Sequence, residues 1–364
     1  MVLLSGATSP FAWAFPEMVR HGYVNCTSCH TSPTGGGVLT RYGRELSREI
    51  LSTWGTQNEN ESKFAYGLIS PPEWLDLMGL YRSVYAYQKT PNRSQSKYIF
   101  MQNDLEAAVQ VKNWYFVATA GYANKVNDTS IADHFISRRN FIGYRPTEET
   151  SIRAGRFYPA FGINTADHII PTKRALGWDE GQETYNVEAA WIGEKWNLYA
   201  TGVFGRPDQP SLHHETGLAL SPSVSIADTY KVGLSYFYGD AQTTTRHVGG
   251  AWGIFGFTRR FFLLSEWDFQ SQSNKVGSAS AKTGIVNYQR LDYEFIQGLH
   301  LFLTQDLSHL DLEDSQTLSH SYGAGLQFFP RPHFEWDLSW QKLRRISVSN
   351  AYTDFAWLMF HYYL

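Results

Sequence analysis

The only two cysteines of the 364-residue chain lie three positions apart, and a histidine directly follows the second. They are Cys26, Cys29 and His30, within the stretch CTSCH. Two thiols and an imidazole at this spacing can attach a prosthetic group, bind a metal ion or form a disulfide. Which of these chemistries fits depends on the elements that must position the three side chains.

The stretch Cys26-x-x-Cys29-His30 resembles the haem-attachment site of c-type cytochromes. In that family the two thiols form thioether bonds to the haem vinyl groups, and the adjacent histidine binds the iron. The resemblance implies one haem c, with Cys26 and Cys29 as covalent anchors and His30 as an axial iron ligand. It rests on the five positions CTSCH alone. A covalent link suits a short segment with few apolar residues, because such a segment cannot enclose a haem in a deep pocket.

Three other chemistries fit the cysteine pair less well. A Cys26–Cys29 disulfide is compatible with an exported protein, but it leaves His30 without a role. A structural zinc ion takes four ligands, and two thiolates with one imidazole fall short of that number. A thioredoxin-like redox pair needs a βαβ pattern, which the neighbouring sequence lacks.

The ligand on the opposite face of the iron is less clearly marked. Histidine and methionine are the usual ligands there. His21 and Met18 are the nearest candidates in sequence, and we favour His21 as the distal ligand. If the haem lies inside a barrel, further candidates are His134, His168, His213 and His214. An open position that binds water or a small ligand is the remaining alternative.

Charge and hydropathy limit the partners and the compartment. The formal net charge is -3, which gives no electrostatic reason to expect nucleic acid. No run of about eighteen apolar residues occurs, which excludes a membrane-spanning helix but not a spanning β-barrel. The stretch Ala12-Trp13-Ala14 resembles a secretory cleavage site, so residues 1–14 are expected to be the remnant of an export signal.

From about Gly79 onward, apolar and polar residues alternate with the period of a β-strand. Phe334 and Trp336, for example, alternate with Glu335 and Asp337. Many such segments run ten residues or more, whereas ordinary strands have about five or six, so their length indicates an oblique crossing of a lipid layer. Sixteen strands are predicted, at 77–90, 98–112, 113–126, 133–146, 150–162, 183–194, 196–206, 214–226, 229–240, 245–257, 260–273, 282–297, 299–311, 317–330, 333–346 and 352–364.

The connections between these segments alternate between short, such as 193–195, and long, such as 206–215. Periplasmic turns and external loops of outer-membrane barrels alternate in this way. The longest connection, 162–183, follows the fifth strand. Sixteen strands, both chain ends on one side and a long loop after strand five are similar to the general porin family. That resemblance implies that residues 162–183 fold into the pore, and the alternating final strand up to Leu364 resembles the same proteins' insertion signal.

The segment ahead of the barrel, residues 15–75, is predicted to carry the haem. It contains a triple glycine at 35–37 and one helix at about 40–54. One face of this helix would present Leu39, Tyr42, Leu46 and Ile50. These residues are too few to bury a core independently. We therefore expect residues 15–75 to pack against the lumen or the periplasmic rim of a barrel formed by 76–364.

Carboxylates on the polar strand faces are expected to line the lumen. They could bias a pore towards cations or hold an acid–base pair, but pairing with arginines such as Arg290 is the simpler expectation. No enzyme is predicted. The carboxylates are Asp104, Glu106, Glu188, Glu266, Asp268, Asp292, Glu294, Glu335 and Asp337.

The sequence therefore predicts an all-β fold, a transmembrane antiparallel β-barrel of about sixteen strands in a Gram-negative outer membrane. A short N-terminal haem-bearing segment with one helix would lie in the periplasm or in the lumen. The predicted function is electron transfer at the outer membrane, with the lipid bilayer and periplasmic redox proteins or multihaem cytochromes as partners. The alternative is a porin for small solutes whose haem-bearing segment acts as a plug or a redox gate.

Overall fold

The computed structural model describes residues 15–55, 63–90, 93–122, 135–167, 170–179, 181–208, 211, 214–277 and 280–364. The expected signal remnant, residues 1–14, lies outside the described residues.

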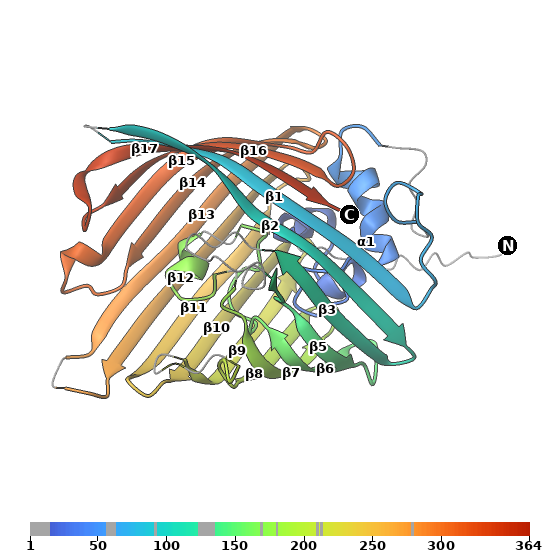
Figure 1. Ribbon diagram of the computed structural model, residues 1–364, viewed down its shortest axis with the longest axis horizontal. Helices are drawn as coiled ribbons and strands as arrows, with labels where there is room; N and C mark the ends of the chain where they lie inside the picture. Colours follow the sequence, from blue (N-terminus) through green and yellow to red (C-terminus); the bar gives the residue numbers. More distant parts are fainter. Residues whose placement is uncertain are drawn as a thin grey trace.

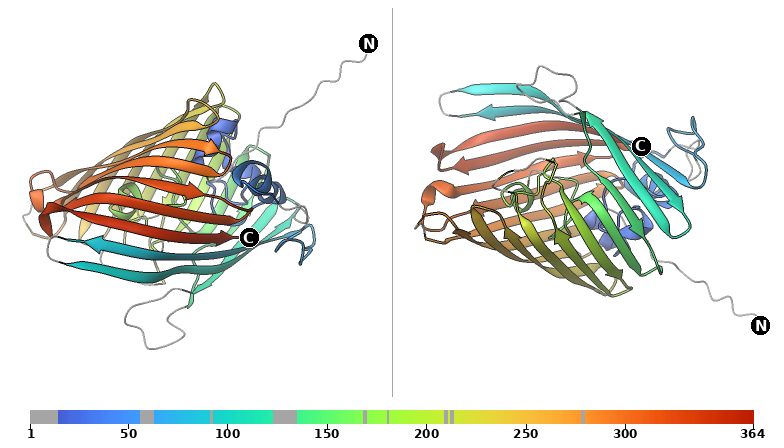
Figure 2. Two further views of the ribbon diagram at one scale, coloured as in Figure 1. Left: turned by 90° about the horizontal axis from the view of Figure 1, so that it is seen from above. Right: turned by 60° about the horizontal axis from the view of Figure 1, so that its bottom comes forward.

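The described strands form one antiparallel sheet that closes on itself (Figures 1 and 2). Seventeen strands are hydrogen-bonded in ring order, and the first, β1, pairs with both β2 and the last strand, β17. The short strands β4 and β5 both pair with β3, so they are two pieces of a single pass across the barrel. The barrel therefore has sixteen passes, and the predicted fold is confirmed.

The strands are β1 (Leu75–Lys89), β2 (Ser94–Val111), β3 (Trp114–Tyr122), β4 (Phe135–Ile136), β5 (Asn140–Tyr144), β6 (Thr150–Phe157), β7 (Thr184–Ile192), β8 (Trp196–Val203), β9 (Thr216–Ile226), β10 (Tyr230–Asp240), β11 (Thr244–Gly256), β12 (Phe261–Asn274), β13 (Lys282–Ile296), β14 (Leu299–His309), β15 (Leu318–Phe328), β16 (Phe334–Arg345) and β17 (Ser349–Tyr363). The helical elements are η1 (Pro16–His21), η2 (Cys26–Ser28), α1 (Arg41–Leu46), η3 (Ser47–Leu51), α2 (Pro171–Arg174) and η5 (Ser315–Thr317).

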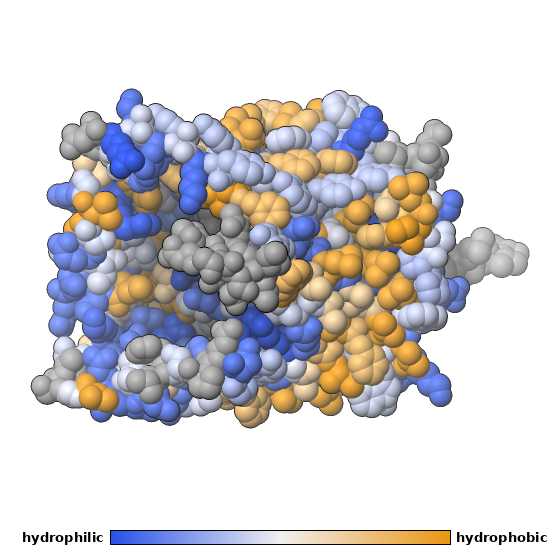
Figure 3. Space-filling view, viewed as in Figure 1, coloured by the Kyte–Doolittle hydropathy of each residue, from blue (hydrophilic) through white to orange (hydrophobic). Residues whose placement is uncertain are grey.

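The alternation along each strand places polar side chains inside the barrel and apolar ones outside. On β16, Glu335 and Asp337 are buried, whereas Trp336 and Leu338 are 40% and 52% exposed. Hydrophobic residues cover much of the face seen in Figure 3, and hydrophilic residues gather at its left-hand end. A protein that buries charge and exposes tryptophan and leucine is matched to a lipid solvent. The pairing of β1 with β17 closes the sheet, and an open sheet edge is not tolerated in lipid.

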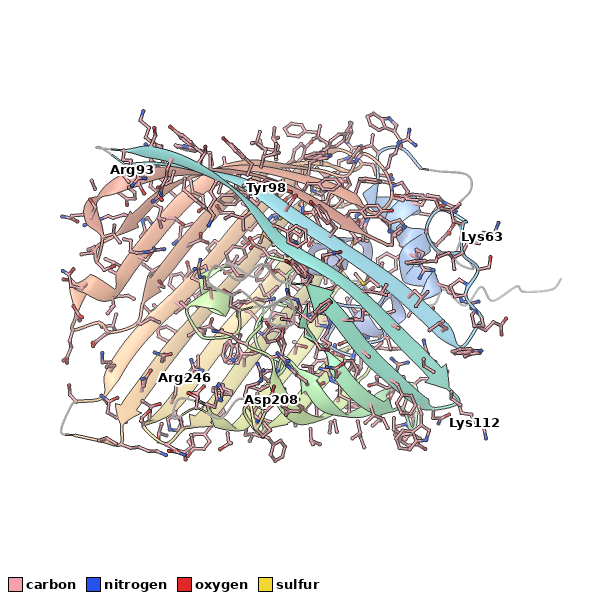
Figure 4. All side chains as sticks on the ribbon, in the orientation of Figure 1. Lys63, Arg93, Tyr98, Lys112, Asp208 and Arg246 are labelled. Carbon is pink, nitrogen blue, oxygen red and sulfur yellow. The ribbon has the colours of Figure 1, made fainter. Side chains whose placement is uncertain are left out.

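The two ends of the barrel differ in the length of their connections. At one end the strands meet in tight turns, where backbone with positive φ at Lys112, Ala227 and Asp228 reverses the chain within a few residues. Lys63 and Lys112 mark this end in Figure 4, and Arg93 marks the opposite end with the longer loops. The C-terminus and α1 also lie at the short-turn end (Figure 1), which is the periplasmic end of outer-membrane barrels.

The N-terminal segment, residues 15–55, lies in the periplasmic half of the lumen and makes one circuit of its inner wall. It contacts in turn strands from across the sheet, through the pairs Arg20–Glu294 on β13, Val24–Lys231 on β10, Asn25–Asn197 on β8, Ser32–Arg153 on β6, Val38–Glu106 on β2 and Ser47–Tyr363 on β17. The barrel wall thus supplies the packing surface that the segment lacks by itself.

The predicted helix at 40–54 is present as α1 followed by the π-helical turn η3. Thr40 caps it, since its Oγ1 accepts from the Gly43 amide at 3.1 Å. No helix in the described part of the chain is long and apolar enough to cross a membrane.

The connection between β6 and β7, residues 158–183, folds into the lumen, as the porin resemblance implies; we call it the inward loop. The Ile163 amide donates to Glu266 Oε2 at 3.0 Å, and the Gly162 amide donates to Ser235 Oγ at 2.8 Å. Arg246 of β11, labelled in Figure 4, donates to the Leu176 carbonyl at 2.7 Å. These bonds tie the loop to β10, β11 and β12 across the lumen.

A charge on the lipid-facing surface should destabilise the barrel. Leu338→Arg places a cation near the middle of β16, where an outward arginine costs about 2–4 kcal/mol of folding free energy. Reversible urea unfolding in lipid vesicles measures this loss. Val348→Arg is the matched control, because Val348 is 71% exposed in the turn between β16 and β17. Equal losses in the two variants would contradict a membrane-facing β16.

Candidate functional site

Residues 26–30 form a single helical turn within the lumen. The Cys29 and His30 amides both donate to the Cys26 carbonyl, at 3.3 and 3.0 Å. The second bond has the spacing of an α-helical turn, so the Cys26 and His30 side chains project to the same side. The structure therefore brings together two of the three residues that the sequence singles out.

Residues 35–43 of the same segment pack against this turn and hold it in place. His30 pairs with Leu39 in an antiparallel bridge, and the Thr40 amide donates to the Cys29 carbonyl at 2.8 Å. Gly43 packs so closely on Cys29 that a β-carbon there would collide with the Cys29 backbone. The three glycines at 35–37 have φ values of 81°, 74° and 68°, a left-handed run that side-chain-bearing residues rarely adopt.

His30 is held in one orientation and one tautomer. Its Nδ1 lies 3.2 Å from the Gly37 carbonyl oxygen, which can only accept a hydrogen bond. Nδ1 therefore carries the proton, and the lone pair of the neutral ring is on Nε2. Burial lowers the pKa of His30 to about 4, against a smaller opposing effect of the Gly37 carbonyl. A neutral imidazole anchored through Nδ1 is the form in which histidine binds metals.

The two cysteines have different surroundings, and no disulfide joins them. Burial raises the pKa of the Cys26 thiol, and Lys231 offsets this only in part, so Cys26 is protonated at neutral pH. Cys29 is fully buried in an apolar cluster with Met18, Leu46 and Leu51. Two thioether bonds would therefore require the Cys29 side chain to turn from this cluster towards Cys26.

Cys26 and His30 line a cavity of about 270 Å³ between the N-terminal segment and the inward loop. This volume is below the range of about 300–1,000 Å³ that is typical of ligand pockets. Much of its wall is apolar, in contrast to the polar lumen of a barrel. The apolar lining residues include Val19, Val24, Leu39, Phe157, Ile163 and Trp252. Arg82, Arg139 and Lys173 add positive charge to the wall, although Arg139 is paired with Glu106 and the Glu266 carboxyl also lines the cavity.

These features fit a haem in three respects. The apolar walls suit a flat macrocycle, the cations suit its two carboxylates, and His30 presents a neutral imidazole. Two features do not fit directly: the cavity is small for a macrocycle, and Cys29 packs beside the cavity rather than on its wall. Among the described residues no group of three histidine, cysteine or acidic side chains is placed to hold a metal ion directly.

The predicted distal ligand, His21, lies away from the cavity wall. Its Nε2 accepts a hydrogen bond from Arg20 Nε at 3.1 Å, and burial with the Arg20 charge lowers the pKa of His21 to about 4. Met18 packs in the Cys29 cluster. His214 lines a separate depression with Phe204 and Arg206 on the loop side. His134, His168 and His213 lie outside the described residues.

Two further side chains that no sequence motif marks, His361 and Met78, also line the cavity. His361 is on the inward face of β17, between Phe360 and Tyr362 of the outward face. The alternation that predicted the strand therefore also places His361 in the lumen. The alternation cannot show that His361 lines the same cavity as His30.

The lumen carboxylates pair largely as expected. Arg290 binds Asp292 at 2.7 Å, Arg138 binds Asp104 at 2.9 Å and Arg153 binds Glu188 at 2.7 Å. Arg153 also donates to Ser32 and Thr34 and lies 3.8 Å from the centre of the Phe157 ring. Arg153 therefore pairs with Glu188 within the barrel wall and also anchors the N-terminal segment.

No protein-family model matches the sequence, and no curated protein does either. Solved structures match over most of the chain. A loop-deletion mutant of OmpT, an outer membrane protein of Vibrio cholerae, has a TM-score of 0.63 and 8% identity over 80% of this chain and 99% of that chain. OmpF of Salmonella typhi, in complex with daunomycin, has a TM-score of 0.59 and 12% identity over 80% and 97%.

An anion-selective porin from Comamonas acidovorans has a TM-score of 0.59 and 10% identity over 80% of this chain and 99% of that chain. At these identities the likeness concerns the fold. The closed barrel and its apolar outer surface are those of a Gram-negative outer-membrane protein. The matches support the porin-like barrel and carry no information about haem.

Removing the Arg153 guanidinium should loosen the N-terminal segment. Arg153→Met leaves Glu188 buried without its ion-pair partner, which costs about 3–5 kcal/mol of stability. We expect faster proteolysis of intact, membrane-embedded protein within residues 15–55. Arg174→Met is the control, because the Arg174 side chain is 66% exposed and lies 3.8 Å from Asp179. Unchanged proteolysis in Arg153→Met would show that this ion pair does not anchor the segment.

Proposed function

We propose that this outer-membrane barrel holds one haem c in its lumen and exchanges electrons with redox proteins of the periplasm. The observation that carries the proposal is the turn at residues 26–30. It puts Cys26 and an anchored, neutral His30 on the wall of an apolar cavity inside the barrel.

Each residue of the site has a distinct role in this proposal. Cys26 and Cys29 hold the haem covalently, and His30 binds its iron through Nε2. The bound haem would supply one-electron chemistry. The inward loop covers the cavity on the side of the long loops, and the N-terminal segment covers it on the periplasmic side.

The position of the site favours a periplasmic electron partner. The N-terminal segment fills the periplasmic half of the lumen, so the site lies nearer the short-turn end. The apolar band of such barrels is about 25 Å tall, which one haem does not span. Passage of electrons across the membrane would therefore use further haems, as multihaem cytochromes supply.

Replacing both cysteines tests the haem directly. We expect the full-length protein, produced in a host that attaches haem c, to keep a haem stain after denaturing electrophoresis. The double variant Cys26→Ala/Cys29→Ala should lose the stain yet remain a folded barrel, which heat-modifiable migration reports. The single variants Cys26→Ala and Cys29→Ala, stained in the same way, test each covalent anchor separately. A wild-type protein without covalent haem would end the electron-transfer proposal.

The likeness to porins favours a second candidate function, a solute porin whose N-terminal segment is a plug. Buried contacts such as Arg20–Glu294, at 2.9 Å, hold the segment in the lumen. We therefore expect single molecules in planar bilayers to pass little current compared with an open porin. Large, steady conductance in the wild type would favour the porin. Conductance that changes on reduction would favour a redox gate.

A further inference from the structure

His361 is a second histidine at the cavity, and it comes from the opposite end of the chain. It lies on β17, is 5% exposed and lines the cavity that Cys26 and His30 line. Among the described residues of the cavity wall, His30 and His361 are the only two histidines.

A carboxylate fixes the ring of His361. Its Nδ1 lies 2.7 Å from Glu335 Oε2 on the neighbouring strand β16. A carboxylate accepts, so Nδ1 carries the proton, and in the neutral form of the ring the lone pair is on Nε2. Metal-binding histidines typically donate their second ring nitrogen to a carboxylate or a carbonyl in this way. His30 and His361 thus show the same arrangement, one with a carbonyl and the other with a carboxylate.

The carboxylate is itself held by a chain of hydrogen bonds. Gln327 Nε2 donates to Glu335 Oε1 at 2.6 Å, and Arg290 donates to Gln327 Oε1 at 2.6 Å. Arg290 in turn binds Asp292 at 2.7 Å. Glu335 therefore cannot turn away from His361 without breaking this chain, and the imidazole stays in one orientation.

His361 and His30 each neighbour a residue of the same hydrophobic cluster. The Tyr363 ring centre lies 5.1 Å from that of His361, and Tyr363 belongs to the same buried cluster as Leu39. Leu39 pairs with the His30 backbone. His30 and His361 thus both border this cluster and line the same cavity, one from the N-terminal segment and the other from the barrel wall.

We propose that His361 is the second axial ligand of the haem iron, on the face opposite His30. The inference rests on the proposed haem site and assigns the sixth ligand to the barrel wall instead of to His21. Met78, also on the cavity wall, is the competing ligand. It lies in an apolar cluster with Leu80 and Phe157, and nothing there orients its sulfur as Glu335 orients His361.

The test uses absorption and paramagnetic resonance spectra of the full-length protein purified with haem attached. We expect wild type to be low-spin in both oxidation states. His361→Ala should keep covalent haem, lose the low-spin signal and bind carbon monoxide readily, and added imidazole should restore the low-spin spectrum. Met78→Leu and His21→Ala are matched controls and should leave the wild-type spectrum unchanged.

A second substitution covers the case in which His361→Ala does not fold. His361→Met keeps a ligand at this position and should remain low-spin, with a raised reduction potential, because methionine raises the potential relative to histidine. A low-spin His361→Ala protein, or a His361→Met protein with an unchanged potential, would overturn the assignment. Loss of the low-spin signal in Met78→Leu or His21→Ala would transfer the role to that residue. A wild type without covalent haem would instead refute the proposed function, so the two failures are distinct.

Discussion

The pairing of charges inside the barrel is the constraint on which the rest of this structure depends. Lipid outside the barrel forces apolar side chains outward, and the period of the strand then forces polar ones inward. Inside a filled barrel those charges lose water and need partners. Glu106 finds them in Arg139, Thr119 and the Val38 amide, of which the last belongs to the N-terminal segment. The N-terminal segment thus supplies a hydrogen-bond donor to a buried carboxylate of the wall, and the wall supplies the acceptor that holds the segment.

The strands could be predicted because their signal is local. Alternation and turn residues lie within ten or so positions of each other, and the predicted boundaries agree with those of the structure to within a few residues for most strands. The break between β4 and β5 was not predicted. The seventeen strands form sixteen passes only because β4 and β5 share one partner, which the sequence pattern cannot show.

The site could be predicted only in part, because the cavity wall around residues 26–30 is formed by residues distant in the sequence. The motif at 26–30 is contiguous and therefore visible in the sequence. The contact of Arg20 with Glu294 joins residues 274 positions apart and has no local signature. The same holds for the cavity wall, where His361 and the inward loop meet the N-terminal segment. The orientation of Cys29 into an apolar cluster likewise depends on tertiary packing.

The circuit of residues 15–55 around the inner wall has a consequence for biogenesis. The segment touches β2 and β6 near one side of the β1–β17 seam and β13 and β17 towards the other. A chain threaded in this way reaches its place most simply while the seam is still open. Any group enclosed there would then bind before the barrel closes in the membrane. Maturation of the N-terminal segment would therefore precede membrane insertion of the barrel.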